Sequence, residues 1–220
     1  MMDKNWNEAI KNEVYHSDAY HLKEAKFSRE PKHIIDIGTN YGWFSYLAAE
    51  LHPQCHVWAY ELMEENYVVA KENLKKFNNA QVSNKGVTGD NVILQTLYTS
   101  HNRGGHKGLY AGNNCYISKS RFVSTKVDNR IIDEIPPQIS FKEIIETNKI
   151  DYVDFLKIDC EGCEYEIFNQ IFKYDLDKRI KNLVFEIHGK GNPEYNKLLK
   201  ELEKRFSTFK KGKITKASNI

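Results

Sequence analysis

The chain has 220 residues, of which 28% are charged, and a formal net charge of +2 at pH 7. This length predicts a single α/β domain that can bury a core without disulfide staples. The net charge is too small for the basic surface typical of nucleic-acid binding, so we expect no nucleic-acid partner.

The four cysteines, Cys55, Cys115, Cys160 and Cys163, lack the regular spacing of a disulfide framework, which is typical of free thiols in a reducing compartment. Residues 1–20 contain no apolar stretch of the kind found in a secretory signal. No apolar run approaches the ~20 residues that span a bilayer. We therefore expect a soluble, cytoplasmic protein without membrane insertion. The sequence leaves the oligomeric state open, a homo-oligomer included.

In chain order, residues 1–30 predict an N-terminal helical arm that ends before Pro31, and residues 31–220 predict one globular domain. Strand-like and helix-like patterns then alternate with short links, which is typical of βαβ units with right-handed crossovers. The predicted elements of this half are strands 33–38, 56–61 and 80–87, and helices 43–51 and 63–77.

The pattern loosens between residues 88 and 130. Strand-like runs over 92–98 and 121–127 flank a stretch rich in Gly, Asn and Ser. This stretch predicts a long loop or hairpin insertion, of the kind that carries substrate specificity. Regular elements then resume, and Ser140 and Glu143 have the spacing of a helix capping box. The predicted elements are helices 140–148, 161–172 and 193–206, strands 152–159 and 182–188, and a hairpin within 207–220.

The loop DIGTNYG, residues 36–42, lies between the first predicted strand and helix, where a doubly wound sheet binds its ligand. A dinucleotide fingerprint would place a glycine where this loop has Asp36. A carboxylate there repels a pyrophosphate but suits a cationic amine or sulfonium. Glu61, which ends the second strand, can accept both hydroxyl protons of a ribose. Together with Gly38 and Gly42, these acids favour S-adenosylmethionine (SAM) over NAD.

Three blocks of the chain resemble the FkbM family of SAM-dependent methyltransferases: IIDIGTNYGWFS (34–45), YEL (60–62) and VDFLKIDCEGCEYEIF (153–168). The third block is the most specific, because it matches the family pattern D-x-x-K-I-D-x-E-G-x-E. The matching residues are Asp154, Lys157, Ile158, Asp159, Glu161, Gly162 and Glu164. The resemblance covers about residues 31–190. It implies a class I, Rossmann-like α/β fold with a mostly parallel sheet of about seven strands flanked by helices.

The resemblance also implies SAM as the cofactor and a set of residues that hold it. The glycine loop would line the methionine part of SAM, the end of the second strand its ribose, and the end of the third strand its adenine. By position, the implied set is Asp36, Gly38, Thr39, Asn40, Gly42, Glu61, Leu62, Lys85, Gly86, Val87 and Asp159.

A hydroxyl acceptor must lose its proton, either to a general base or through a metal that acidifies it. Candidates lie where the middle strands end, and we predict Asp159, Glu161 and His188 as catalytic residues. The same three residues offer oxygen and nitrogen ligands for a divalent cation, although we predict no metal. Glu164 and Glu186 fit either a catalytic role or a structural one. Glu161 and Glu164 share a helix face near its N-terminus, where acids stabilise a helix.

The segment DCEG, residues 159–162, stands where amino-methylating enzymes carry N-P-P-[FY], a motif that grips a planar amine or amide. This difference favours O-methylation. We therefore expect a SAM-dependent O-methyltransferase that acts on a hydroxyl of a sugar, glycan or small metabolite. Two other classes stay open: a catalytically inactive methyltransferase fold that serves as a binding module, and an NAD-linked oxidoreductase or epimerase, which Asp36 disfavours.

The C-x-x-C formed by Cys160 and Cys163 lies among acids, which raise the pKa of a thiol. A zinc site would need two further ligands, and the other cysteines are isolated in the sequence. In the family pattern, both cysteines occupy variable positions. We therefore predict neither a redox role nor a zinc role for this pair.

Overall fold

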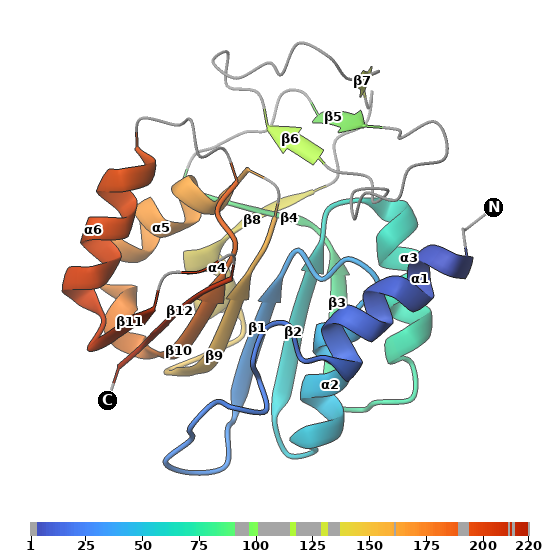
Figure 1. The fold of residues 1–220 in the computed structure, drawn as a ribbon, viewed down its shortest axis with the longest axis horizontal. Coiled ribbons are helices and arrows are strands. Elements are labelled where there is room, and N and C mark those ends of the chain that lie inside the picture. The colour runs from blue at the N-terminus through green and yellow to red at the C-terminus, as the bar shows by residue number, and fades with distance from the viewer. Residues whose placement is uncertain are drawn as a thin grey trace.

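The structure is a computed structural model that describes residues 4–90, 97–100, 115–117, 129–131, 137–160, 162–188, 194–210, 212 and 214–219. Its centre is a seven-stranded sheet with the strand order β11-β12-β10-β9-β1-β2-β3 (Figure 1). The strands are β1 (His33–Ile37), β2 (His56–Glu61), β3 (Ala80–Asn84), β9 (Val153–Ile158), β10 (Ile180–Phe185), β11 (Thr208–Lys210) and β12 (Thr215–Ser218). The pairs from β3 to β10 are parallel, whereas β12 is antiparallel to both of its neighbours.

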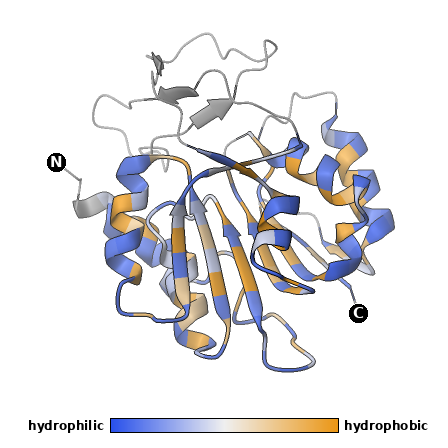
Figure 2. Cartoon of the chain, turned by 180° about the vertical axis from the view of Figure 1, so that it is seen from behind, coloured by the Kyte–Doolittle hydropathy of each residue, from blue (hydrophilic) through white to orange (hydrophobic). Residues whose placement is uncertain are grey.

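Helices cover both faces of this sheet. They are α1 (Lys4–Lys11), α2 (Trp43–Leu51), α3 (Glu64–Leu74), α4 (Phe141–Thr147), α5 (Glu164–Lys173) and α6 (Tyr195–Arg205), with a 3₁₀ turn over Leu176–Arg179. In Figure 1, α5 and α6 lie at one side of the sheet and α1, α2 and α3 at the other. The central strands carry many apolar residues, drawn in orange in Figure 2, because a parallel sheet covered on both faces needs apolar side chains on both.

The core has two parts, one on each face of the sheet. Alternate residues of β1 point to opposite faces, so Ile35 packs with α4, α5 and α6, whereas Ile34 packs with α2. Leu22, from the segment before β1, is buried in the second part. The N-terminal segment is therefore part of the folded core.

The predicted arm over residues 1–30 is helical over residues 4–16. Helix α1 continues into a π-helical turn over Asn12–His16, and residues 17–30 follow in turns and irregular backbone. The indole N–H of Trp43 in α2 donates to the Asn7 side chain at 2.7 Å, which ties α1 to α2. Among the described residues, no helix is both long and apolar enough to cross a membrane.

The structure confirms most predicted elements within a few residues of their bounds. The Ser140–Glu143 capping box is formed by both of its hydrogen bonds. The predicted third strand, residues 80–87, divides into β3 and a separate β4 (Gly86–Thr88), which pairs in parallel with β8 (Gln138–Ser140). The division follows from Asn84, whose side-chain amide donates to the carbonyls of Glu61 and Leu62 and so ends the pairing of β3 with β2.

The insertion predicted over residues 88–130 is described only in part. The predicted strand 92–98 overlaps β5 (Leu97–Ser100), which pairs antiparallel with β6 (Cys115–Ile117) and β7 (Asn129–Ile131). The predicted strand 121–127, and most of the predicted loop between the two strands, lie outside the described residues.

Candidate active site

The glycine loop leaves the C-terminal end of β1 and packs directly against the backbone that follows β9. Gly38 has a φ of +74°, and a Cβ there would lie 1.8 Å from the carbonyl oxygen of Asp159. Gly42 has a φ of +81°, and a Cβ there would lie 3.2 Å from Ala70 of α3. Only glycine combines this left-handed backbone with such a close approach. The two glycines therefore fix the loop between its neighbours.

A buried ion pair holds the base of this loop. Asp36 and Lys157 have side chains that are 0% and 3% exposed, and Nζ lies 3.1 Å from Oδ1 of Asp36. The hydroxyls of Thr39 and Ser45 donate to the other carboxylate oxygen at 2.5 and 2.7 Å, and Lys157 donates to the Gly38 carbonyl at 2.5 Å. Burial by itself would lower the pKa of Lys157, but the charge of Asp36 raises it above its ordinary value. Because Lys157 compensates its charge, Asp36 shapes the loop without presenting a net charge to a ligand.

The glycine loop and the end of β2 each carry a buried hydrogen-bond acceptor, in Asn40 and Glu61. Glu61 accepts the backbone N–H of Asn40 at 2.7 Å through one oxygen and that of Met63 at 2.9 Å through the other. Burial raises the pKa of the Glu61 carboxyl to about 7. The side-chain oxygen of Asn40 is buried and has no hydrogen-bond partner among the described residues. An unsatisfied acceptor and a carboxylate with lone pairs to spare fit the amine and the ribose diol of SAM.

The other predicted cofactor residues border the same region. Leu62 directly follows Glu61 and packs against the core. Lys85 links β3 to β4, where Gly86 donates its N–H to the Pro137 carbonyl at 3.0 Å and Val87 is buried. The chain thus leaves the seven-stranded sheet at residues 85–87, which are the residues predicted to contact the adenine.

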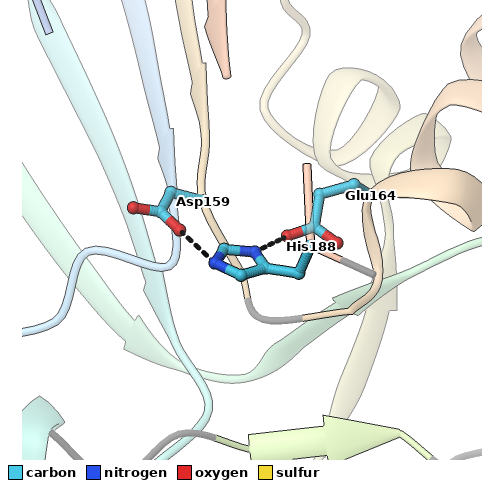
Figure 3. Close-up of side chains that lie close together, drawn as sticks. All are labelled: Asp159, Glu164 and His188. Atoms are coloured by element: carbon cyan, nitrogen blue, oxygen red, sulfur yellow. Dashed lines mark hydrogen bonds and ion pairs between the residues drawn. The ribbon is translucent and has the colours of Figure 1, made fainter. Parts of the chain in front are cut away.

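The predicted catalytic residues Asp159 and His188 come together at the ends of β9 and β10 (Figure 3). The Nδ1 atom of His188 lies 2.9 Å from Oε1 of Glu164, the first residue of α5. Its Nε2 atom lies 4.0 Å from Oδ1 of Asp159. Asp159 and His188 are each 19% exposed, whereas Glu164 is fully buried. The imidazole is therefore held between one buried carboxylate and one accessible carboxylate.

Glu164 is fixed by the turn that precedes α5. Its Oε1 atom accepts the backbone N–H of Cys160 at 3.3 Å, and its Oε2 atom accepts that of Gly162 at 2.9 Å. Gly162 has a φ of +128°, which a side chain rarely tolerates. Gly162 and Glu164 therefore act together in this turn, and they correspond to the G-x-E of the family pattern. Glu161, the third predicted catalytic residue, lies outside the described residues.

Asp159, Glu164 and His188 offer ligand atoms within 4.8 Å of one another, a set that could hold a metal ion. However, Glu164 already accepts two backbone N–H groups as well as bonding the imidazole. Asp159 accepts a hydrogen bond from Tyr20. A cation would have to compete with these bonds. The arrangement therefore favours a hydrogen-bonded network that positions the imidazole.

Tyr20 is a site residue that no pattern in the sequence indicates. Its hydroxyl donates to Oδ2 of Asp159 at 2.5 Å, although the two residues are 139 positions apart in the chain. It lies in the N-terminal segment, outside the blocks that resemble a family. Only the folded position of this segment reveals the contact.

The C-x-x-C cysteines are free thiols, as predicted. Cys163 is buried. Burial raises the pKa of the Cys160 thiol well above its ordinary value, and the charge of Glu164 adds to this effect. A high pKa suppresses the thiolate that redox and metal chemistry require. The pair therefore lacks the setting of a redox centre.

Taken together, the strand order, the antiparallel β12 and the glycine loop define a class I, Rossmann-like methyltransferase fold. The family model described as "Methyltransferase FkbM domain" matches residues 36–208. This chain belongs to that family of SAM-dependent methyltransferases, which confirms the resemblance and the fold class predicted from the sequence. Tyr20 precedes the matched region.

Solved structures of other methyltransferases resemble this chain. The precorrin-6y C5,15-methyltransferase of Geobacter metallireducens GS-15 has a TM-score of 0.51 and 14% identity, and the match covers 93% of this chain and 89% of that one. The N-terminal domain of human METTL16 in complex with SAH has a TM-score of 0.46, 14% identity, and coverages of 94% and 68%. The methyltransferase FkbM of Methylobacillus flagellatus KT has a TM-score of 0.45, 14% identity, and coverages of 83% and 41%. At such identities, the likeness concerns the fold alone. None of the curated proteins matches this chain in sequence.

Proposed function

We propose that this methyltransferase transfers the methyl group of SAM to a hydroxyl oxygen of a sugar, glycan or small metabolite, with His188 as the general base. One observation carries the proposal: the His188 imidazole lies between Glu164 and Asp159, at the end of the strands beside the glycine loop. The acceptor is expected to be a small molecule or carbohydrate, because the net charge of the chain is only +2.

SAM, when bound, supplies an electrophilic methyl group on a positively charged sulfur. Asn40 would accept a hydrogen bond from its amine, and Glu61 from its ribose hydroxyls. Gly38 and Gly42 would allow its close approach to the backbone, and Thr39 would keep the loop closed through its bond to Asp36. Leu62 and residues 85–87 would border the adenine. The chain's own bonds hold these groups in place before any ligand binds.

Asp159, Glu164 and His188 form a group, called the His188 cluster from here on. We expect this cluster to take up the proton of the acceptor. Donation from Nδ1–H to Glu164 fixes the tautomer whose basic nitrogen is Nε2. Nε2 takes the hydroxyl proton as the acceptor oxygen bonds to the methyl carbon and the carbon–sulfur bond breaks. Asp159, 4.0 Å from Nε2, then stabilises the imidazolium that forms. This division of roles assigns orientation to the buried carboxylate and charge stabilisation to the accessible one.

The first test concerns ligand class. Calorimetric titration of the folded chain with SAM, S-adenosylhomocysteine (SAH) and NAD should show binding of both SAM compounds and none of NAD. Saturation at about 100 Kd should stabilise the fold by about 2.7 kcal/mol. Labelled SAM is then screened against hydroxylated metabolites and glycans. SAM binding without transfer to any acceptor would favour the inactive binding module instead.

The second test concerns the base. His188→Gln should lower kcat by about 100-fold or more, because general bases contribute factors of this order, and should leave SAH affinity unchanged. His52→Gln is the matched control, since His52 directly follows α2 and its imidazole contacts Glu30 and the ring of Phe27. Turnover is measured across pH, with EDTA and with added Mg²⁺. Wild-type turnover in His188→Gln, or turnover that EDTA abolishes and Mg²⁺ restores, would overturn the general-base assignment.

A further inference from the structure

Tyr20 lies in a turn that the protein holds in an uncommon backbone conformation. The His21 N–H donates to the Asp18 carbonyl at 2.8 Å, and Asp18 and His21 both have positive φ values, of 51° and 57°. The Asp18 carboxylate accepts the backbone N–H groups of Leu22 and Lys23, each at 2.9 Å. Left-handed residues cost energy and are retained where something over-determines them. Here the turn places Tyr20 against the end of β9 and against α2.

The Tyr20 side chain contacts both halves of the site. Its hydroxyl donates to Oδ2 of Asp159 at 2.5 Å, on the side of the His188 cluster. Its ring lies 4.9 Å from Nζ of Lys157, the cation that holds the glycine loop. The edge-on contact with Phe44 of α2, at 5.7 Å between ring centroids, fixes the plane of the ring.

From these contacts, we propose that Tyr20 is a positioning residue that holds the Asp159 carboxylate against His188 and makes the N-terminal segment part of the active site. This inference rests on the proposed function, because it assigns Asp159 the task of stabilising the imidazolium. With Oδ2 bound to the phenol, Oδ1 points toward Nε2 of His188. Without that bond, the 19%-exposed carboxylate can rotate into solvent.

The phenol keeps its donor role across the working pH range. Burial raises the pKa of the Tyr20 hydroxyl well above its ordinary value, and the Asp159 charge adds to the effect. Tyr20 therefore keeps the proton that it donates, and hydrogen bonds to charged acceptors are the strong ones. A general base would need the opposite property, a phenol that ionises readily. The geometry thus assigns Tyr20 to positioning and leaves proton transfer to His188.

The test compares two variants, each of which removes the hydroxyl of one tyrosine in the N-terminal segment. Tyr20→Phe keeps the ring near Lys157 and deletes the bond to Asp159. Tyr15→Phe is the control, because its hydroxyl donates at 2.5 Å to Glu50 at the surface of α2. Imidazole ¹H–¹⁵N spectra are recorded, with the His188 signals identified by their loss in His188→Gln. Tyr20→Phe should shift these signals, and Tyr15→Phe should not.

Turnover gives the second readout. Tyr20→Phe should lower kcat by about 10-fold, the order expected for a lost hydrogen bond to a charged group, with the KM for SAM unchanged. In an Asp159→Asn background, the same substitution should cost nothing further, because a residue that acts through Asp159 loses its effect with it.

The inference is overturned if Tyr20→Phe leaves both the His188 signals and kcat at the values of Tyr15→Phe. Additive losses in the double variant would also overturn it, since they would mean that Tyr20 acts without Asp159. If the wild-type chain methylates no hydroxyl acceptor, the proposed function fails. In that case, the His188 signals still test whether Tyr20 positions Asp159 against His188, because recording these signals requires no acceptor.

Discussion

The glycine loop and the His188 cluster lie at the ends of neighbouring strands, yet they are built differently. The loop is held by residues close in sequence and by a fully buried ion pair between Asp36 and Lys157. The His188 cluster joins Asp159, which follows β9, Glu164 of α5 and His188, which lies beyond the end of β10. Tyr20 of the N-terminal segment binds this cluster, and two of the cluster's side chains are partly accessible. The difference indicates that the glycine loop, the proposed cofactor side, is rigid and that the His188 cluster, the proposed acceptor side, is more adjustable. Substitutions can test this division.

The largest expected effect comes from the buried pair. Lys157→Met leaves Asp36 buried without its counter-charge and should lower the free energy of unfolding by about 3–5 kcal/mol. Lys173→Met is the matched control, because Lys173 pairs with Asp90 while 60% exposed, and it should cost far less than Lys157→Met. Urea unfolding measures both. Similar losses in the two variants would mean that the loop is not held by its ion pair.

Next in size are the glycines of the loop. Gly38→Ala forces a Cβ into the Asp159 carbonyl and should cost more than about 3 kcal/mol, together with loss of SAH binding. Gly42→Ala meets only close van der Waals contacts at Ala70 and should cost about 1–2 kcal/mol, the price of the left-handed backbone. Thermal unfolding and SAH calorimetry measure the pair. The reverse order would contradict a rigid contact between the loop and β9.

A smaller effect concerns pH. The Glu61 carboxyl has a pKa of about 7, raised by burial, and its ionised form is the better acceptor for ribose hydroxyls. The affinity for SAM should therefore be highest above pH 7 and should fall as the pH drops through 7. The expected decrease is about tenfold between pH 8 and pH 6. The Gln side chain of Glu61→Gln does not titrate. This variant should bind SAM more weakly, and its affinity should not change as the pH passes through 7. Parallel slopes in the two proteins, by calorimetry, would assign the titration to another group.

The sequence could single out the residues of the glycine loop and the end of β2 because their signals are local. Asp36, Gly38 and Gly42 lie within one short loop, and Glu61 ends the next strand. The structure brings these residues together through bonds such as that from the Asn40 N–H to Glu61. Their roles in SAM binding stay predictions. The alternation of strands and helices likewise predicted the parallel sheet, since each apolar run is short enough to be assigned without knowledge of its partners.

Three features could not be predicted from patterns along the chain. The role of Glu164 depends on two backbone N–H groups that only the folded turn aims at it. The contact from Tyr20 to Asp159 depends on how the N-terminal segment packs. Residues 80–87 were predicted as one strand, because no local feature of the sequence indicates that the strand ends at Asn84. Each depends on contacts between distant parts of the chain.

The departure of β4 from the main sheet has a consequence for how acceptor choice can change. β4 and β8 pair in register from Gly86–Gln138 to Thr88–Ser140, so the two ends of the intervening segment, residues 89–137, are fixed side by side. Lengthening a segment closed in this way costs little free energy, because closure entropy grows only slowly with length. We therefore predict that exchanging residues 89–137 between relatives changes the choice of acceptor and leaves the proposed methyl donor site intact.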